Sequence, residues 1–311
     1  MLLARLRRYF SDLLNMLAVA VILMNSAGSY AQPNDAEALA LLSTVEQSLA
    51  NVSYTGIYTY EHTGVIDSIK VSKMVVDGEV TSRMEHLSGR EVKPIVHQSS
   101  LAACEEGLGQ RQSAFDKSNL IAHYQFHQLG KERIAGRQAL MLQAEPRDEF
   151  RFGYRLAIDE ETHMPLLLAL VSGNRLVERF QFVEFTPVPS PTLEQAPQAS
   201  QNDHTLTGSC IDQTVQSPWV MGWLPSGFKL VSVKSDNGTD MYSYSDGLSR
   251  VSVFVSALAG GATLEGEARR GATIVYLDKV ALGDRLFQVS VVGEVPKVAA
   301  QKIATSVVAK Q

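Results

Sequence analysis

The sequence lacks the common signatures of catalytic sites. It contains no G-x-S-x-G elbow, no G-x-x-x-x-G-K-[ST] phosphate loop, no H-E-x-x-H zinc helix and no C-x-x-C pair. These absences argue against a hydrolase or a metalloenzyme of a common kind. We therefore expect a protein that is not an enzyme and that has no cofactor or metal of its own.

Basic residues and long apolar runs are also scarce. The 311 residues include 28 Lys and Arg against 33 Asp and Glu, which gives a formal net charge of −5. Nucleic-acid binding calls for a basic face, so this mildly acidic chain argues against a nucleic-acid partner. Apolar runs after residue 31, such as residues 166–171, have the length of strands rather than of membrane-spanning helices.

The first 31 residues have the features of a secretory signal peptide. Three arginines open the segment, residues 13–24 are apolar apart from Asn15, and Ser29 and Ala31 are the small residues of a cleavage site. The apolar run is too short to cross a bilayer, which takes roughly 20 residues. We therefore expect an exported chain, cleaved after Ala31, with no membrane-spanning segment in its mature form.

Cysteine is limited to Cys104 and Cys210. In an oxidising compartment an isolated pair can form a disulfide, which here would close a loop of about 100 residues and add roughly 4–5 kcal/mol by chain entropy. The alternative is two reduced, unrelated thiols. The sequence gives no distance between the two sulfur atoms, so both alternatives stay open.

Proline is concentrated in one stretch. Four of the 11 prolines lie in residues 187–206, which contain no aromatic residue and few apolar ones. Proline removes backbone donors and favours extended geometry, so this stretch predicts an exposed, semi-rigid linker. A chain of this length suggests two domains, and we place them at residues 32–186 and 207–311.

The N-terminal domain is predicted to contain one helix followed by strands. Leu39, Leu42, Val45 and Leu49 recur at helical spacing after Asp35, which can cap the helix start. Glycine-containing turns divide the remainder into alternating segments. The predicted strands cover residues 54–61, 69–76, 80–87, 132–144, 150–159, 165–171 and 176–185. This pattern predicts a long antiparallel sheet that curls over a helix.

The C-terminal domain is predicted to be mostly β. Its two predicted hairpins cover residues 242–255 and 273–292 and turn at an Asp-Gly and a Gly-Asp dipeptide. Pro296, followed by Ala299, Ile303 and Val307 at helical spacing, predicts a closing amphipathic helix. Both domains are therefore expected to be α+β.

Three aromatic residues, Trp219, Trp223 and Phe228, are candidates for a partner-binding patch. Tryptophan is enriched in interface hot spots, which favours a surface role. The alternative is that all three fill the core of a small domain.

Three tyrosines alternate along one predicted strand and share one of its faces. They are Tyr54, Tyr58 and Tyr60. They either line a cavity or pack against the helix predicted from residue 35. The first alternative predicts an apolar cavity, between the sheet and that helix, which accepts an acyl chain.

Two polar groups are weaker candidates for chemistry. On a strand, His123 and His127 would lie about 13 Å apart, too far to share one metal ion. Glu145, Asp148 and Glu149 are interleaved with arginines. We expect a solvated turn with local ion pairs there, not a catalytic carboxylate pair.

Six segments, from YTGIYTYEHTG to VVGEVP, together resemble one protein family. They cover residues 54–64, 132–165, 176–185, 223–230, 244–255 and 291–296. In this order they resemble the MucB/RseB family of periplasmic sigma-E regulators, and no family phrase lies between residues 91 and 129. The resemblance implies a lipoprotein-carrier-like (LolA-like) half-barrel over residues 32–186 and an anti-sigma-binding domain over residues 207–311.

The resemblance further implies a negative regulator of an envelope-stress sigma factor pathway. Such a protein would bind the periplasmic part of a single-pass membrane anti-sigma factor, shield it from regulated proteolysis, and release it on sensing envelope lipid or lipoprotein. The alternative is a periplasmic lipid or lipoprotein carrier with the same N-terminal fold. A simple carrier needs only the first domain, so the second domain favours the regulator.

Overall fold

The computed structural model describes eight stretches of the chain. They are residues 35–89, 95–100, 117–189, 191–195, 197, 204–207, 218–257 and 264–310. These stretches belong to one compact unit, Gln32–Gln311. The predicted signal peptide, Cys104 and Cys210 lie outside the described residues, so cleavage and the disulfide stay predictions. No helix in the described stretches is long and apolar enough to cross a membrane.

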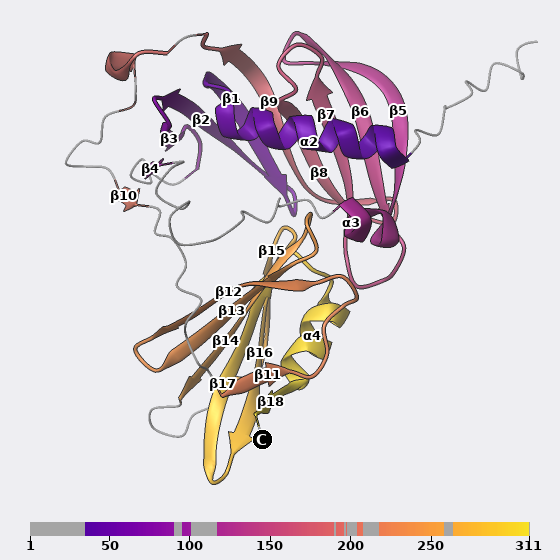
Figure 1. Cartoon of the computed structure of the whole chain (residues 1–311), viewed down its shortest axis with the longest axis vertical. Helices are drawn as coiled ribbons and strands as arrows, with labels where there is room; N and C mark the ends of the chain where they lie inside the picture. Colours follow the sequence, from indigo (N-terminus) through magenta and orange to yellow (C-terminus); the bar gives the residue numbers. More distant parts are fainter. Residues whose placement is uncertain are drawn as a thin grey trace, which may run out of the picture. The chain divides into compact units, whose positions relative to one another are not determined.

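A curved ten-stranded sheet forms the larger part of the fold (Figure 1). Its strand order is β10-β4-β3-β2-β1-β9-β8-β7-β6-β5, and neighbouring strands are antiparallel except for the β10–β4 pair. The strands are β1 (Tyr54–His62), β2 (Val65–Val76), β3 (Glu79–His86), β4 (Ile95–Ser100), β5 (Tyr124–Ile134), β6 (Arg137–Pro146), β7 (Gly153–Asp159), β8 (Pro165–Ser172), β9 (Arg175–Pro187) and β10 (His204–Thr207). The predicted antiparallel sheet is confirmed, whereas β4, the first part of β5 and β10 were not predicted.

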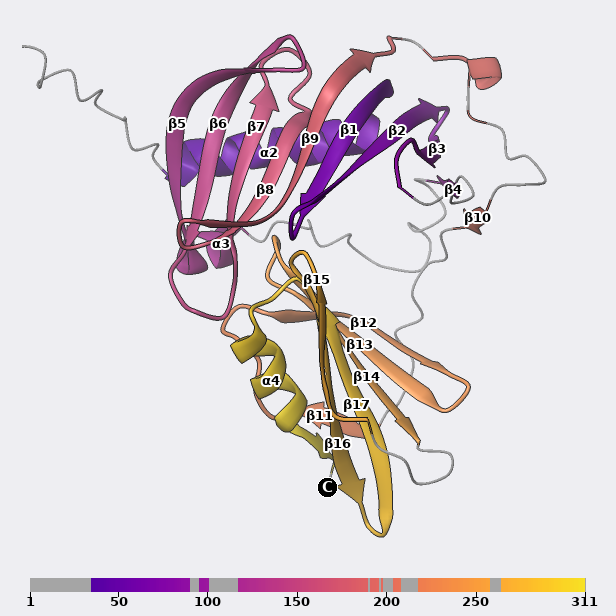
Figure 2. The same ribbon diagram turned by 180° about the vertical axis from the view of Figure 1, so that it is seen from behind.

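Helix α2 (Asp35–Asn51) lies across one face of this sheet, over strands β5 to β9 (Figures 1 and 2). Leu39, Leu42 and Val45 are buried, as predicted. They form one apolar cluster with large side chains of α3 (Lys117–His123) and of the sheet. These include Leu120, Tyr124, Phe126, Leu142, Tyr154, Leu156, Ile158 and Leu170.

The last turn of α2 differs from the prediction. Leu49 is 47% exposed, so it does not belong to the buried stripe. Polar contacts hold this turn instead, because the Lys73 ammonium on β2 donates hydrogen bonds to the carbonyls of Leu49 and Ala50. Burial lowers the pKa of Lys73 to about 8.

A six-stranded antiparallel sheet, ordered β12-β13-β14-β17-β16-β15, forms the smaller part of the fold. Its strands are β12 (Lys229–Asp236), β13 (Thr239–Ser245), β14 (Arg250–Ala257), β15 (Gly266–Arg270), β16 (Thr273–Leu282) and β17 (Arg285–Gly293). Helix α4 (Lys297–Thr305) packs on one face, where Ile303 and Ala299 share a buried cluster with valines of β14 and β17. The two predicted hairpins and the α+β class are confirmed.

The prediction that Val307 continues the closing helix is wrong. Helix α4 ends at Thr305, and Val307 pairs with Met221 in a separate two-stranded sheet of β11 (Trp219–Met221) and β18 (Val307–Ala309). The change of direction occurs at Ser306, whose N–H bonds the Ile303 carbonyl and whose own carbonyl accepts from Gly222 N–H. The chain therefore leaves the helix two residues earlier than its apolar spacing suggested.

We predict that Leu42→Ala lowers the free energy of unfolding by about 2–5 kcal/mol, because it removes a side chain that is only 1% exposed from the cluster beneath α2. Urea unfolding followed by circular dichroism measures the change. Leu49→Ala is the matched control, and its effect should stay within about 0.5 kcal/mol because Leu49 is exposed. Equal losses for the two variants would contradict the described orientation of α2.

Candidate functional site

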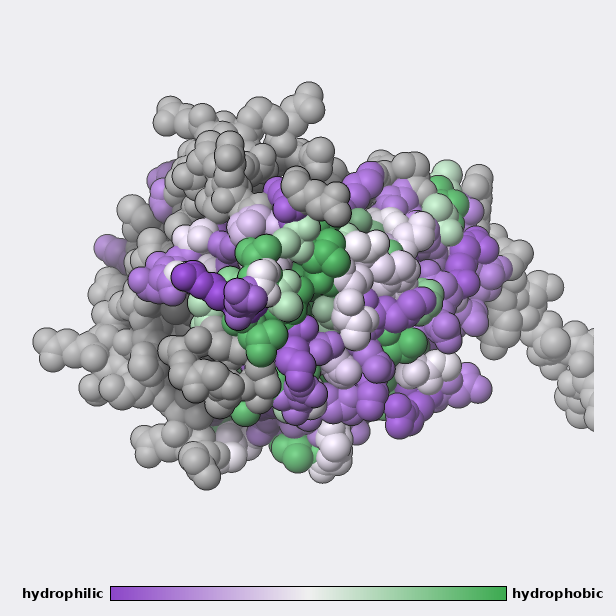
Figure 3. Space-filling view, turned by 90° about the horizontal axis from the view of Figure 1, so that it is seen from below, coloured by the Kyte–Doolittle hydropathy of each residue, from purple (hydrophilic) through white to green (hydrophobic). Residues whose placement is uncertain are grey.

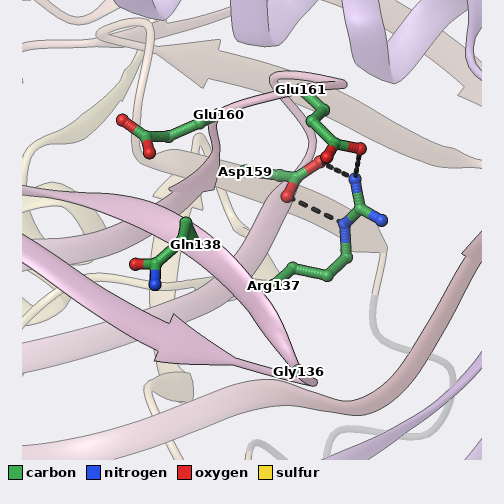
Figure 4. Close-up of a pocket in the computed structure, with 6 residues that line it drawn as sticks. All are labelled: Gly136, Arg137, Gln138, Asp159, Glu160 and Glu161. Carbon is green, nitrogen blue, oxygen red and sulfur yellow. Dashed lines mark hydrogen bonds and ion pairs between the residues drawn. The ribbon is translucent and has the colours of Figure 1, made fainter.

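A polar pocket of about 350 Å³ lies at the turns that join β5 to β6 and β7 to β8 (Figure 4). The Arg137 guanidinium donates two hydrogen bonds of 2.9 Å to Asp159, and it also reaches Glu161. Burial raises the pKa of Asp159, but the hydrogen bonds from Arg137 and Thr162 outweigh it, so the pKa is lowered. These polar groups are engaged in holding the turns together, which makes this pocket a structural site.

An aromatic surface lies on β1 and β9, on the face of the sheet that α2 partly covers. Tyr60 pairs with Phe180 and Tyr58 pairs with Phe182 across the two strands. The rings of Tyr60 and Phe180 are stacked at 4.5 Å with an interplanar angle of 15°, and Tyr58 meets Phe182 at 5.8 Å. We call these four residues the aromatic face.

Phe180 connects the aromatic face to the apolar floor beneath α2, whereas Phe182 packs against a second cluster that contains Phe185. Phe180 pairs with Leu168 on β8, and Leu168 pairs with Leu156, which belongs to the cluster that contains Leu39 and Leu42. The four rings are half-buried, whereas Leu42 is 1% exposed. Partly exposed apolar surface therefore lies beside α2, over β1 and β9, while the stripe of α2 is already packed.

The ring contacts of the three tyrosines lie mainly on β9 and not on α2, and the lining of a cavity stays a prediction. Tyr54 packs against Phe182 and Phe185, and burial raises its pKa to about 12. Burial also raises the pKa of Tyr58, whose hydroxyl contacts the Met84 sulfur at 3.8 Å. The rings pack against β9 and still leave one side partly open.

The first buried polar contact between the two sheets is centred on Asp246, in the β13–β14 turn. Its Oδ2 accepts hydrogen bonds from Arg151 Nη1 at 2.8 Å and from the Tyr124 hydroxyl at 3.0 Å. Its Oδ1 accepts from the N–H groups of Leu248 and Ser249. The side chains of Arg151 and Asp246 are fully buried, and such charges are tolerated only when protein groups replace water.

Arg151 uses its other donors as well. Nη2 donates to the Ser226 carbonyl at 2.6 Å, and Nε donates to Asp148 at 3.1 Å. The predicted local ion pairing is therefore confirmed for Asp148, but the predicted solvation is wrong for Arg151. No local pattern predicts the contact with Asp246, because 95 residues separate the two partners.

The second buried polar contact is centred on Glu178 of β9, which is 2% exposed. Its Oε2 accepts a hydrogen bond from the Tyr60 hydroxyl at 3.0 Å and another from the Ala272 N–H at 2.8 Å. Tyr60 belongs to the aromatic face, and Ala272 belongs to the β15–β16 turn of the smaller sheet. Burial, together with the Glu178 carboxylate, raises the pKa of Tyr60. No sequence motif singled out Glu178.

The three aromatic candidates of the smaller sheet have different environments. Trp219 is 3% exposed and Phe228 is 8% exposed, and both belong to its core. Trp223 is half-buried, packs edge-on against Phe150 at 5.0 Å, and lies 4.5 Å below the Lys302 ammonium. Burial thus favours the core interpretation for Trp219 and Phe228, whereas partner binding by Trp223 stays a prediction.

The small β11–β18 sheet, which begins at Trp219, carries exposed apolar side chains. Val220 and Val308 form a cross-strand pair in the β11–β18 sheet and are 41% and 51% exposed. Figure 3 shows a face on which apolar side chains gather near the centre and hydrophilic ones surround them. Such patches on a protein surface often mark interaction sites.

The histidine candidates are arranged differently from the prediction. His123 is the last residue of α3 and not a strand residue, so the predicted strand spacing to His127 is wrong. His127 lies on β5, 3.6 Å from the Glu145 carboxylate. Within the stretches that the structure describes, no group of three or more His, Cys, Asp or Glu residues is arranged to hold a metal ion.

We predict that Arg151→Met and Asp246→Leu each lower the free energy of unfolding by about 3–5 kcal/mol, because each leaves one buried charge without its partner. The double variant should be more stable than either single variant, since it leaves neither charge. Urea unfolding of the four proteins gives the coupling free energy.

The exposed pair of Lys131 and Glu160 is the matched control for this cycle. Lys131→Met and Glu160→Leu should each change the free energy of unfolding by less than about 1 kcal/mol, because both side chains are in contact with water. A coupling at Arg151 and Asp246 no larger than that of the control pair would contradict their described burial.

Both sheets match known proteins. The MucB/RseB N-terminal domain model matches residues 37–200, and the MucB/RseB C-terminal domain model matches residues 213–308. The sigma factor AlgU regulatory protein MucB of Pseudomonas aeruginosa is 29% identical over 304 residues, which cover 92% of this chain and 96% of that protein. The sigma-E factor regulatory protein RseB of Haemophilus influenzae is 24% identical over 315 residues, which cover 90% and 93%.

Solved structures agree with these matches. A crystal structure of MucB in complex with MucA(peri) has a TM-score of 0.70 and 30% identity, and the alignment covers 88% of this chain and 99% of that one. A crystal structure of MucB has a TM-score of 0.66 and 28% identity, with 88% and 98% covered. This chain therefore belongs to the MucB/RseB family.

Proposed function

We propose that this protein is a periplasmic negative regulator of an envelope-stress sigma factor pathway. It binds the periplasmic part of a single-pass membrane anti-sigma factor. Bound in this way, it shields the anti-sigma factor from regulated proteolysis. It releases the anti-sigma factor when it senses envelope lipid or lipoprotein.

The observation that carries this proposal is the similarity, across both sheets, to MucB solved in complex with MucA(peri). Both family domains are matched along this chain, so the parts used by such a complex have counterparts here. Three buried carboxylates, Asp159, Asp246 and Glu178, are engaged in hydrogen bonds within the fold. The sequence features of a signal peptide support export to the periplasm.

The aromatic face supports the sensing step. Its half-buried rings give an apolar surface with edges that remain polar, and this suits an acyl chain or the lipid part of a lipoprotein. Each methylene removed from water contributes about 0.8 kcal/mol, so an acyl chain of moderate length gives useful affinity before ordering costs.

Release follows from linkage between the two sites. If a lipid weakens anti-sigma binding about 30-fold, the anti-sigma factor must weaken lipid binding by the same factor, a coupling of roughly 2 kcal/mol. The lipid must then bind one arrangement of the protein better than the other. A carrier that only shuttles lipid would need no such coupling and no second sheet.

We predict that the mature protein retains, from detergent extracts of the envelope of its own organism, a single-pass membrane protein with a cytoplasmic sigma-binding domain. Mass spectrometry of the retained proteins identifies it, and an excess of free mature protein should abolish the capture. If lipoproteins are captured and no such membrane protein is found, the carrier alternative replaces this proposal.

We predict that 11-(dansylamino)undecanoic acid binds the mature protein saturably and that palmitate displaces it. Phe182→Ala should weaken binding about tenfold, or ~1.4 kcal/mol, because it removes one ring of the aromatic face. Dansyl fluorescence measures both affinities. Val183→Ala is the matched control, since its side chain is 55% exposed at the β9 bulge. Absence of saturable binding at micromolar protein would contradict the lipid-sensing part of the proposal.

A further inference from the structure

Tyr60 belongs at once to the aromatic face and to the contact between the two sheets. Its ring is stacked on Phe180 at 4.5 Å, and its hydroxyl donates a hydrogen bond of 3.0 Å to Glu178 Oε2. The first interaction uses the face of the ring and the second uses the hydroxyl, and both belong to one rigid side chain. A shift of the ring on Phe180 therefore moves the hydroxyl against Glu178.

Glu178 links this hydroxyl to the smaller sheet through a single oxygen atom. The Oε2 that accepts from Tyr60 also accepts from the Ala272 N–H at 2.8 Å. Glu178 is 2% exposed, so water has little access to replace either donor. A buried carboxylate that loses one donor must reorient or recruit water, because an incompletely bonded buried charge is costly.

The turn that carries Ala272 fits closely against these two side chains. Gly271 has φ +59°, a conformation that favours glycine, and a Cβ atom there would lie 2.8 Å from the Tyr60 hydroxyl oxygen. The same Cβ would overlap the Glu178 carboxylate. Next to it, Arg270 lies 3.7 Å from Asp67 on β2. The turn thus has no room to accommodate a displaced Tyr60 without moving itself.

We infer that Tyr60 is the positioning residue that couples a ligand on the aromatic face to the Gly271-Ala272 turn of the smaller sheet. An acyl chain that packs on Phe180 displaces the Tyr60 ring, weakens its bond to Glu178, and so loosens the hydrogen bond from Ala272. This inference deepens the proposed lipid sensing and rests on it. It names the residues through which the ligand alters the contact between the sheets.

The contact at Asp246 serves as the fixed point during this change. Its partner Tyr124 begins β5, which lies five positions from β1 in the order of the larger sheet. Its other partner, Arg151, precedes β7 and does not belong to the aromatic face. The contact at Glu178 thus includes a residue of the aromatic face, and the contact at Asp246 does not. A ligand on the aromatic face can therefore loosen the first contact while the second stays in place as a hinge.

The experiment uses the mature protein and 11-(dansylamino)undecanoic acid, with two readouts. Dansyl fluorescence reports binding of the probe, and hydrogen exchange followed by mass spectrometry reports the Ala272 amide in a peptide over residues 266–276. In the unaltered protein, saturation with the probe should speed exchange of this amide by at least about fivefold. Exchange at the Asp246 turn should stay unchanged.

Tyr60→Phe keeps the stacked ring and removes only the hydroxyl. Because the probe no longer has to break the bond to Glu178, it should bind this variant more tightly, by up to about fivefold. Exchange at Ala272 should already be fast without the probe, and the probe should add little. Glu178→Gln, a second variant that removes the charge, should behave in the same way. Tyr244→Phe is the matched control, because the Tyr244 hydroxyl contacts the Met221 sulfur and does not belong to the aromatic face, and it should respond like the unaltered protein.

The two readouts separate failure of this inference from failure of the proposed function. If the probe binds and exchange at Ala272 does not change, lipid sensing stands and the inference is overturned. If Tyr60→Phe and Glu178→Gln both respond to the probe like the unaltered protein, the coupling does not pass through Tyr60 and the inference is again overturned. Lack of saturable probe binding overturns the lipid sensing and the inference together.

Discussion

Two buried carboxylates, Asp246 and Glu178, hold the two sheets of this protein together. Each accepts hydrogen bonds from the opposite sheet, Asp246 from Arg151 and Tyr124, and Glu178 from Ala272. Buried charges of this kind add little net stability compared with apolar packing, but they tolerate very few arrangements of their partners. The two carboxylates therefore fix how the sheets meet, while apolar contacts such as that of Phe150 with Trp223 also join them.

Local sequence patterns predicted most of the elements and missed the contacts between them. The stripe from Leu39 to Val45 and the Gly-containing turns act over a few residues, so spacing alone identifies α2 and the hairpins. The ends of the two helices were not predicted correctly, because distant partners determine them. Lys73 caps the last turn of α2. The hydrogen bond from the Gly222 N–H to the Ser306 carbonyl accompanies the end of α4 before Val307. Tertiary contacts overrode propensity at both places.

Only part of the candidate site could be predicted from the sequence. Alternation placed Tyr58 and Tyr60 on one face of β1, but their ring partners on β9 lie more than 100 residues away and depend on the register of that pairing. The polar contacts between the sheets could not be predicted either, because they also depend on residues that are distant in the sequence. Arg151 resembled a solvated arginine beside Asp148, and only the fold reveals that Asp246 removes it from water.

The position of Glu178 on β9 argues for regulation rather than simple transport. Glu178, Phe180 and Phe182 alternate along one strand, so the buried acid lies one strand repeat, roughly 6.6 Å, from the ring that would meet a ligand. A carrier made of the larger sheet alone would gain nothing from a carboxylate there, since an apolar residue would extend the ligand surface. With the smaller sheet in place, the same carboxylate accepts hydrogen bonds from the Ala272 N–H and from the Tyr60 hydroxyl. The strand that offers the ligand surface thus also carries the contact that a ligand would disturb.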